Sequence, residues 1–401
     1  MATIAAYGST FHAFGVLVEP IHADTGWSLG TLGAAYSLSL VLGGLGAFAA
    51  GTVVDRLGGR LVLLGGATVG AGLLASAAAA PSATWFVGLW GAGAGVVGAL
   101  AFYHVTIVVM VRARGGSDPR AYAALTFLGG LSSPIYLPLT ALSIDRFGWR
   151  PTQVILGGSL AVTLAASATI VPARPSSPDS SAAQSRDLGA FAALGAALSE
   201  PRTRLFVAAV ALASIVGTAM HAYQIPAMHA AGLSLAAAST LAAIRGLCSL
   251  PGRALLAVVV RRTGATAALG GAYLTMAVGT ALLLGGSGAF APAYAVVTGI
   301  AYGSLLPLQA LVAAEVFPES RLGTLMGAQQ GLNGLVAAAA PVSAGLLLDR
   351  TGSYTTLIAV ASVGFVVATI ASPVSRWVSA DATVETARRE RAPASGAPRG
   401  R

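Results

Sequence analysis

The sequence predicts an all-α membrane protein whose twelve transmembrane helices form two repeats of six helices each. Three observations predict this class: a strongly hydrophobic composition, recurring apolar runs of membrane-spanning length, and short motifs that recur half a chain apart. Hydrophobic residues make up 55% of the 401 residues and charged residues only 9%, with a mean hydropathy of +0.77. A soluble domain carries about 25% charged residues, so this chain has too few charges to cover a water-facing surface. We therefore expect a multi-pass protein in a lipid bilayer.

Apolar runs of about 20 residues, the length that a helix needs to cross a bilayer, recur along the chain. The expected helices of the first half are Thr3–Ile21, Ser28–Val54, Leu61–Ala80, Thr84–Val111, Ala121–Ile144 and Thr152–Val171. Those of the second half are Leu205–Met228, Leu235–Val260, Ala265–Gly285, Ala289–Val316, Leu322–Leu348 and Tyr354–Val374. The N-terminal run has neither a basic region nor a cleavage site, so we interpret it as the first span and not as a signal peptide.

A single internal break in hydrophobicity, Pro172–Glu200, divides the chain and is rich in Pro, Ser and Ala, as linkers are. We expect an N-terminal six-helix bundle at 1–172, a cytoplasmic linker at 173–201, a C-terminal six-helix bundle at 202–378 and a disordered cytoplasmic tail at 379–401. Within the linker, Leu188–Leu198 has the composition of a short helix that lies on the membrane surface.

Arginine supplies every basic charge apart from histidine, because the chain contains no lysine. If Met1 is cytoplasmic, most arginines fall in cytoplasmic loops, the linker or the tail. The opposite side then holds only Arg146, Arg150 and Arg350. Loops that are rich in arginine stay on the cytoplasmic side, so we expect both termini on the cytoplasmic side of the plasma (inner) membrane.

A short charged segment lies between the second and third expected helices. Its glycines and charged residues are Gly51, Asp55, Arg56, Gly58, Gly59 and Arg60, and glycine allows the positive φ that a tight turn needs. An Asp-Arg pair alone would indicate only a polar turn. The full pattern Gly-x-x-x-Asp-Arg-x-Gly-x-Arg resembles the signature between helices 2 and 3 of the major facilitator superfamily of transporters. The resemblance implies the major facilitator fold, with Gly51, Asp55, Arg56, Gly58 and Arg60 as a gating motif.

Two motifs recur in the second half at nearly the same offset, about half the chain. Val53–Gly58 corresponds to Val259–Gly264, and Ile144–Trp149 corresponds to Leu348–Ser353. The matches indicate a duplicated six-helix unit whose two copies enter the membrane from the same side. The copies should be related by an axis along the membrane normal, with the substrate between them near the midplane. Arg261 stands in the second copy where Asp55 stands in the first, so the gating contacts there must differ.

Two arginines fall inside one expected helix. Arg245 lies near mid-depth of Leu235–Val260, and Arg253 lies two turns closer to the cytoplasm. Snorkelling toward the interface is an alternative for Arg253, and a structural ion pair is the alternative for Arg245. No Asp or Glu lies at mid-depth in any expected helix, because Glu19 and Glu315 are near helix ends. A guanidinium without a counter-charge that faces a cavity is a site for an anion.

Three histidines, His12, His104 and His221, also fall inside expected helices. A single buried histidine is more often a hydrogen-bonding residue than a ligand, yet three of them without buried carboxylates suggest that one titrates during transport. Most uncharged polar residues in such helices join helices together. The candidate substrate-binding residues are Arg245, Arg253, His12, His104, His221, Tyr36, Tyr136 and Asn333.

The composition also argues against other classes of function. The arginines are spread singly or in pairs between apolar runs, so the basic charge does not indicate nucleic-acid binding. Cys248 is the only cysteine, and the histidine spacing gives no metal pair, so we expect no metal and no other cofactor. Without lysine there is no phosphate-binding loop of an ATP-driven pump. No catalytic constellation is seen, so we expect no enzyme.

Several shorter motifs suggest a narrower resemblance. Thr25–Ser28, Phe147–Arg150 and Pro251–Arg253 resemble segments of the bacterial relatives of monocarboxylate porters and oxalate/formate antiporters. In that group an arginine of helix 8 binds the substrate carboxylate, and Arg253 stands at the matching place. The group also has an aspartate where this chain has Ser249 and a lysine where it has His12. The resemblance therefore implies carboxylate binding but not that group's proton-coupling pair.

Together these observations predict a secondary active transporter that moves a small organic anion, such as a monocarboxylate, by alternating access as a symporter or antiporter. We expect it to work as a monomer. The alternative within the same fold is an exporter of drugs or hydrophobic compounds, which would need a buried acid for cations. An alternative of another class is a membrane receptor or sensor that does not transport, but the chain has no soluble output domain.

Overall fold

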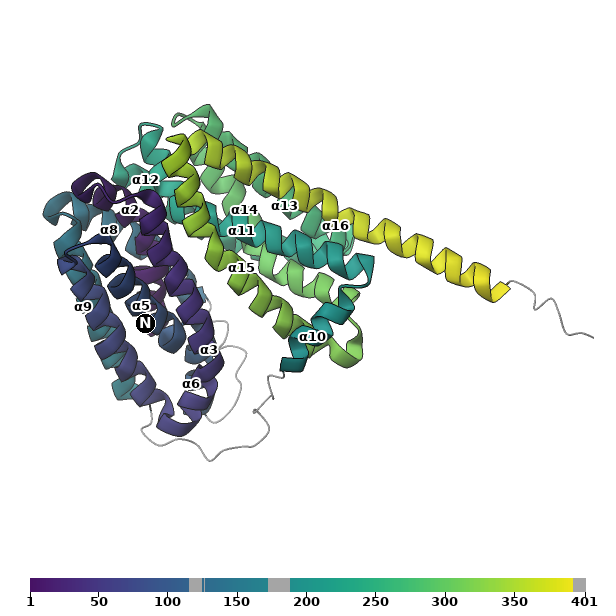
Figure 1. Ribbon diagram of the computed structural model, residues 1–401, viewed down its shortest axis with the longest axis horizontal. Coiled ribbons are helices and arrows are strands. Elements are labelled where there is room, and N and C mark those ends of the chain that lie inside the picture. The colour runs from purple at the N-terminus through teal and green to yellow at the C-terminus, as the bar shows by residue number, and fades with distance from the viewer. Residues whose placement is uncertain (115–124, 126, 172–187, 392–401) are drawn as a thin grey trace, which may run out of the picture.

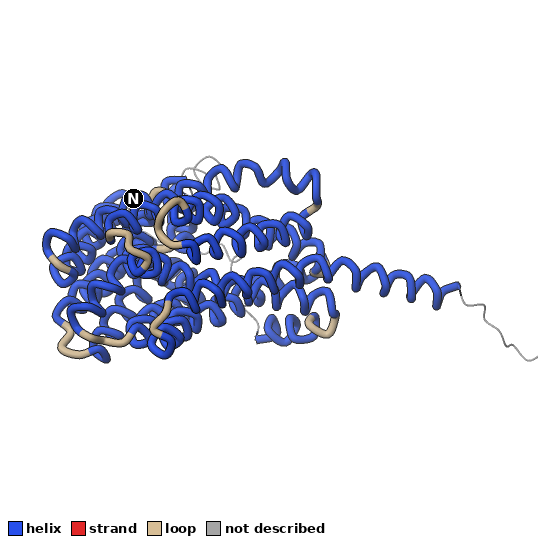
Figure 2. Tube along the Cα trace, turned by 90° about the horizontal axis from the view of Figure 1, so that it is seen from above, coloured by secondary structure: helices blue, strands red, loops and turns tan. Residues whose placement is uncertain are grey.

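The computed structural model describes residues 1–114, 125, 127–171 and 188–391, and of these the side chains of 47–57, 104, 108, 111–114, 188–190 and 373–391 are outside the description. The described residues form helices joined by short connections and contain no strand (Figure 2). Within these residues, eleven helices are long and apolar enough to cross a membrane. A further continuous helical stretch, Ala2–Thr25, precedes them and is divided by a π-helical segment. The predicted class, an all-α protein of membrane-spanning helices, is confirmed for the described residues.

The first half begins with α1 (Ala2–Ala6), the π-helix η1 (Tyr7–His12) and α2 (Ala13–Thr25). α3 (Leu29–Gly65) contains the second crossing and the start of the third. The third crossing continues through the π-helix η2 (Gly66–Gly70) and α4 (Ala71–Ser76) and ends at the 3₁₀ turn η3 (Ala77–Ala79). The remaining helices of this half are α5 (Ala83–Ala101), α6 (Tyr103–Arg114), α8 (Ser132–Phe147) and α9 (Trp149–Ile170).

The second half is preceded by α10 (Leu188–Ala197), a short helix close to the range expected for it. Its six crossings are α11 (Pro201–Ala230), α12 (Leu235–Thr263), α13 (Ala265–Leu282), α14 (Phe290–Val316), α15 (Leu322–Thr351) and α16 (Tyr354–Arg391). Two 3₁₀ turns, η4 (Leu283–Gly285) and η5 (Glu319–Arg321), follow α13 and precede α15.

The two halves form two bundles that lean against each other, with α3 facing α15 (Figure 1). The ribbons of α3 and α15 meet near Leu29 and Thr351 and diverge toward the end where α10 lies. We call the end where α3 and α15 meet the closed end. We call the end where they diverge, beside α10, the linker end.

Hydrogen bonds between the halves concentrate at the closed end. The Leu29 and Gly30 N–H groups at the start of α3 donate to Oδ1 and Oδ2 of Asp349 at 2.9 and 2.8 Å. The Tyr223 hydroxyl of α11 lies 2.9 Å from the Leu29 carbonyl oxygen and 3.1 Å from that of Pro341. Free N–H groups and the helix dipole both favour a carboxylate at a helix N-terminus. Asp349 of one half therefore caps a helix of the other half.

The charged segment Gly51–Arg60 is not the loop that the sequence predicts. The backbone is helical on both sides, and α3 is interrupted only at Gly58, with φ 80° and ψ 155°. This region favours glycine because a Cβ is strained there. The corresponding Gly264 of the second half has φ 80° and ψ 159° and ends α12. One glycine thus makes the turn in each repeat.

α16 continues past residue 378 to Arg391 and extends beyond the bundle (Figure 1). The alanines, glutamates and arginines of this stretch are good helix formers, so the helix continues. The fourth helix was expected to be continuous over Thr84–Val111, but Phe102 is extended, with φ −80° and ψ 174°, and separates α5 from α6. The first part of the linker, 172–187, and the last residues of the tail, 392–401, lie outside the described residues.

Removing the Asp349 cap should open the closed end. Losing a capping carboxylate costs about 0.5–2 kcal/mol. Asp349→Ala should therefore lower, by that amount, the free energy of structures in which the two halves separate there relative to structures in which they meet. Spin labels at Thr84 and Ala289, both exposed at the closed end, should report longer distances by pulsed electron resonance in a Cys248→Ser background.

Asp145, the residue at the corresponding place in the first repeat, is exposed at the end of α8 and provides the matched control. Asp145→Ala should leave the distance distribution unchanged. An unchanged distribution for Asp349→Ala would show that the cap does not hold the end closed.

Candidate functional site

Arg245 lies in the interior of the second half, on α12. Ser234 fixes the start of this helix, because its hydroxyl accepts a hydrogen bond from the Ala237 N–H at 3.2 Å. The Arg245 side chain is only 6% exposed. Its Nε donates to the Thr298 hydroxyl oxygen at 3.0 Å, and Thr298 in turn donates to the Tyr294 carbonyl at 2.7 Å. The guanidinium is therefore held in a fixed orientation against α14.

One face of α14 receives this guanidinium. Tyr294, Thr298 and Tyr302 follow one another at intervals of four residues and so lie along one side of the helix. The Cζ atom of Arg245 lies 4.8 Å from the ring centroid of Tyr302 and 6.0 Å from that of Tyr294. The Tyr294 hydroxyl donates to Gln224 Oε1 at 2.9 Å, which connects the cluster to α11. Aromatic faces at these distances stabilise a cation partly, without neutralising it.

Glycines allow α14 to lie this close to α12. A Cβ at Gly299 would overlap the carbonyl group of Arg245, and a Cβ at Gly303 would overlap that of Ser249. Close helix approach through small residues is usual in membrane proteins. The two glycines therefore determine how near Thr298 and Tyr302 come to Arg245.

His12 and His221 meet at the boundary between the two halves. His12 ends η1 and His221 lies in α11, and their ring centroids are 5.3 Å apart. The Phe11 ring stacks on His221 at 4.0 Å, and His221 Nε2 lies 3.3 Å from the Phe11 carbonyl oxygen. His221 Nδ1 is buried and has no hydrogen-bond partner among the described residues.

The π-helical segment η1 places these side chains. It covers Tyr7–His12, and residues on either side of it keep right-handed helical backbone angles. Single-turn π-helical segments inside α-helices occur frequently at functional sites. Here the segment contains Phe11 and His12, whose rings contact His221 of α11.

No described carboxylate neutralises this cluster. The ion pair that the described side chains form joins Arg150 Nε to Asp24 Oδ2 at 3.8 Å, at the closed end. Among the described residues, no acidic side chain lies within ion-pair distance of Arg245. A buried charge without a partner is costly, so the arrangement is suited to a ligand that brings a negative charge.

Other candidate residues lie around this cluster, not in it. Arg253 is exposed on α12, two turns from Arg245. Tyr36 is buried, and its hydroxyl donates to the Phe11 carbonyl at 3.3 Å. Asn333 of α15 is 7% exposed, and its Oδ1 has no hydrogen-bond partner within the described part of the chain.

The remaining candidates are Tyr136 and His104. The Tyr136 ring lies directly over Gly8 of η1, where a Cβ would overlap it. Tyr136 therefore helps to position the π-helical segment. His104 belongs to α6, and its side chain is outside the description.

The segment that the resemblance implies to be a gating motif lies within α3, at the linker end. Gly58 is buried and makes the helix break, and Arg60 is exposed. Gly51, Asp55 and Arg56 lie in the helical part of α3, but their side-chain surroundings are outside the description.

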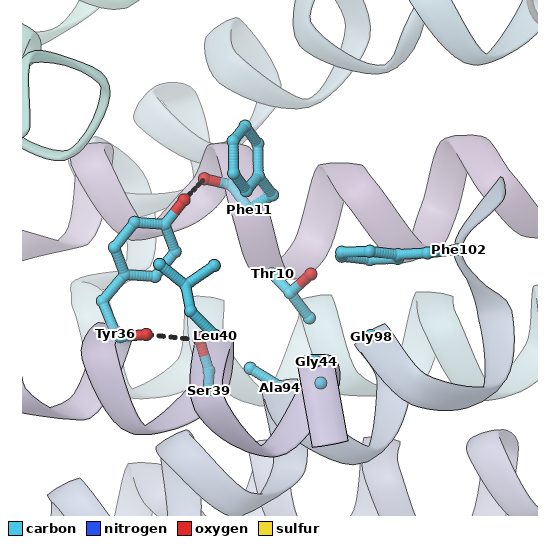
Figure 3. A pocket seen from close by; sticks show the side chains of 10 residues that line it. Thr10, Phe11, Tyr36, Ser39, Leu40, Gly44, Ala94, Gly98 and Phe102 are labelled. Carbon is cyan, nitrogen blue, oxygen red and sulfur yellow. Dashed lines mark hydrogen bonds between the residues drawn. The ribbon is translucent and has the colours of Figure 1, made fainter. Parts of the chain in front are cut away.

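A cavity of about 240 Å³ lies in the first half, between η1, α3 and α5 (Figure 3). Its lining residues are Thr10, Phe11, Tyr36, Ser39, Leu40, Gly43, Gly44, Ala94, Gly98 and Phe102. Phe11 belongs both to this lining and to the contact with His221. The cavity therefore borders the charged cluster.

Three residues of this arrangement were not expected from the sequence: Phe11, Tyr294 and Thr298. Thr298 and Tyr294 carry a readable signal, since together with Tyr302 they place polar groups every four residues in an apolar helix. Phe11 carries no such signal, because an isolated phenylalanine in a membrane helix is ordinary.

Comparison with known proteins now identifies the class. The family profile of the Major Facilitator Superfamily matches residues 1–235 and 207–399, which is nearly the whole chain. The chain belongs to the Major Facilitator Superfamily, whose members are secondary transporters. No curated protein sequence matches the chain.

Solved transporter structures share the fold. A crystal structure of the nucleoside transporter NupG has a TM-score of 0.78 at 16% identity, with 93% of this chain and 96% of that chain covered. A proton-dependent oligopeptide transporter gives 0.67 at 16% identity, covering 95% and 98%. A D-xylose–proton symporter gives 0.65 at 16% identity, covering 92% and 95%. At such low identity these likenesses show the fold alone, and they give no support to the narrower resemblance to monocarboxylate porters.

The absence of an acidic partner for Arg245 among the described residues predicts an unusual effect on stability. Arg245→Met removes a buried charge but keeps the bulk of the side chain, so the midpoint of thermal unfolding of the ligand-free protein should stay the same or rise. Tryptophan fluorescence during heating in detergent measures this midpoint.

Arg150→Met provides the contrast, because Arg150 has an acidic partner: its Nε lies 3.8 Å from Asp24 Oδ2. Its Nη1 donates to the Ala78 carbonyl at 2.7 Å, and its Cζ lies 4.3 Å from the Trp149 ring centroid. This variant should unfold at a lower temperature than the wild type. A larger loss for Arg245→Met than for Arg150→Met would mean that Arg245 has a structural role.

Proposed function

We propose that this chain carries a small organic anion, such as a monocarboxylate, across the membrane by alternating access, with Arg245 as the main contact for its negative charge. The observation that carries the proposal is the buried guanidinium of Arg245, which has no carboxylate partner among the described residues. Of its nitrogen atoms, only Nε has a hydrogen-bond partner in that part of the chain. The two Nη groups remain for the two oxygens of a carboxylate.

The surroundings of Arg245 support an anion over a cation. His12 and His221 add positive charge whenever either ring is protonated, and a cation would then meet only repulsion. An exporter of cationic compounds would need a buried acid, and the described cluster contains none. We propose that one of these two histidines titrates during transport, coupled as symport or antiport.

Arg245 is favoured over Arg253 as the anion contact. The narrower resemblance to monocarboxylate porters implies a carboxylate at Arg253, but this side chain is exposed and lies two turns from the aromatic cluster. Charge–charge interactions at exposed positions are weak because water screens them. Arg253 then attracts the anion toward the site and Arg245 holds it.

The two ends of the protein have different parts in the proposed cycle. The Asp349 cap holds the closed end together, and the segment with Gly51, Asp55, Arg56, Gly58 and Arg60 does so at the linker end when the opposite state forms. We propose that the linker end is cytoplasmic, with both termini on that side of the plasma membrane, and that the monomer is the working unit. Arginine placement supports this orientation.

Carboxylate affinity should depend on Arg245 in a graded way. For the best ligand among acetate, lactate and benzoate, Arg245→Gln should weaken binding by about 1.5–3 kcal/mol, roughly ten- to a hundredfold. Arg245→Lys should restore part of the affinity, since it keeps the charge and loses the planar fork. Titration calorimetry of the purified protein measures these affinities.

Arg253→Gln should cost less than Arg245→Gln in the same titrations. Equal affinity of all three variants and the wild type, or a best ligand that is a cation, would contradict the anion proposal. A larger loss of affinity in Arg253→Gln than in Arg245→Gln would indicate that Arg253 is the main contact for the anion.

The gating motif should affect transport more than binding. Asp55→Ala leaves the Arg245 cluster untouched, so carboxylate affinity in detergent should stay near that of the wild type while uptake into proteoliposomes falls severalfold. Arg262→Ala, an exposed change at the same end of the second half, is the control and should keep both. An equal loss of binding and uptake in Asp55→Ala would argue against gating.

A further inference from the structure

The cavity of about 240 Å³ beside the charged cluster has walls that suit a flat apolar group. Phe11 and Phe102 lie at two sides of it (Figure 3). Phe102 is held in place by Tyr7, whose ring stacks on it with centroids 3.9 Å apart and planes at 12°. Leu40 and Ala94 add aliphatic surface. Aromatic walls favour stacked or edge contacts with another ring.

The hydroxyl groups along the cavity already donate hydrogen bonds to backbone carbonyl groups. Thr10 donates to the Ala6 carbonyl at 2.6 Å, and Ser39 donates to the Tyr36 carbonyl at 2.7 Å. Tyr36 donates to the Phe11 carbonyl at 3.3 Å, a bond that is drawn in Figure 3. These oxygens can still accept, but a sugar or ribose placed here would find no free hydroxyl donor among these three side chains for its own oxygen atoms, which is costly. The cavity thus disfavours the polar solutes carried by the structural relatives.

The size of the cavity fits one ring. A cavity of about 150 Å³ lined by apolar side chains is enough to take up benzene, and this one measures about 240 Å³. An acetate-sized molecule would leave most of it empty. A six-membered ring with a short substituent uses the space.

The cavity and the cationic cluster share one wall. Phe11 lines the cavity and also stacks on His221, whose ring is 5.3 Å from that of His12. A ring in the cavity would therefore lie one side chain, that of Phe11, away from the His221 imidazole.

We propose that the substrate is a ring-bearing carboxylic acid, an aromatic or alicyclic monocarboxylate whose ring occupies the cavity between η1, α3 and α5 while Arg245 holds its carboxylate. This inference rests on the proposed anion transport and adds the class of the substrate. The first half then recognises the apolar ring and the second half the charge, so that full contact requires both halves.

Gly44 provides a way to fill the cavity without disturbing the rest of the protein. It lines the cavity, and a Cβ built on it meets no atom within 4 Å. The neighbouring Gly43 differs, since a Cβ there lies 3.6 Å from the Gly95 carbonyl oxygen. Gly44→Leu should therefore fold and occupy ring space. Gly72→Leu on α4 is the matched control, because Gly72 also has no atom within 4 Å of a Cβ and lies outside the cavity.

The test is equilibrium binding of benzoate, cyclohexanecarboxylate, acetate and benzyl alcohol to the purified full chain. Both ring acids should bind at least about tenfold more tightly than acetate, because they bury apolar surface in the cavity. Gly44→Leu should weaken the ring acids by about tenfold or more and leave acetate within about twofold of the wild-type affinity. Gly72→Leu should change none of them. Gly44→Ala, with a smaller side chain, should show the same ordering with a smaller loss.

The outcomes separate this inference from the proposed function. Acetate binding as tightly as benzoate, or ring acids unaffected by Gly44→Leu, would overturn the ring-bearing substrate while leaving an anion transporter. Benzyl alcohol binding as well as benzoate, or benzoate affinity unchanged by Arg245→Gln, would overturn the anion contact. Binding of none of the acids would overturn both.

Discussion

The arrangement of the candidate site depends on a buried guanidinium that the described protein groups orient but do not neutralise. Thr298 fixes Nε of Arg245 at 3.0 Å and the Tyr302 ring lies 4.8 Å from Cζ, so the charge cannot move toward water without breaking these contacts. Hydrogen bonds and aromatic faces recover part of the desolvation cost, and a counter-charge recovers much more. Under the proposed function, the site is therefore most stable when an anion is bound.

This requirement also connects binding to the movement of the two halves. Arg245 belongs to the second half, whereas Phe11 and His12 reach the same cluster from the first half through η1. A ligand that touches both halves changes the relative stability of their arrangements by its differential affinity. At the closed end, Asp349 and Tyr223 hold the halves together with only a few hydrogen bonds. So small a set of contacts can be broken and remade in each cycle.

Much of the fold could be predicted from the sequence, because membrane helices follow from hydrophobic runs and the repeat follows from motifs. The helical character of Gly51–Arg60 could not, since one glycine makes the turn and the pattern of charges suggested a longer loop. Arg245 was predictable as a buried charge that lacks an acid at its depth. The residues around Arg245 were harder to predict from the sequence. Phe11 joins the cluster through the π-helical segment, and no sequence pattern predicts such a segment. The break at Phe102 likewise depends on its packing against Tyr7, a contact between distant segments.

The most direct measurement is a structure of the protein with bound 4-bromobenzoate, with the bromine located by anomalous scattering. The account predicts that the carboxylate lies within hydrogen-bond distance of the Arg245 Nη atoms and that the bromine lies in the cavity between Phe11 and Phe102. A carboxylate bound at Arg253, or a ligand bound away from the guanidinium of Arg245, would contradict the claim that an unneutralised arginine defines the site.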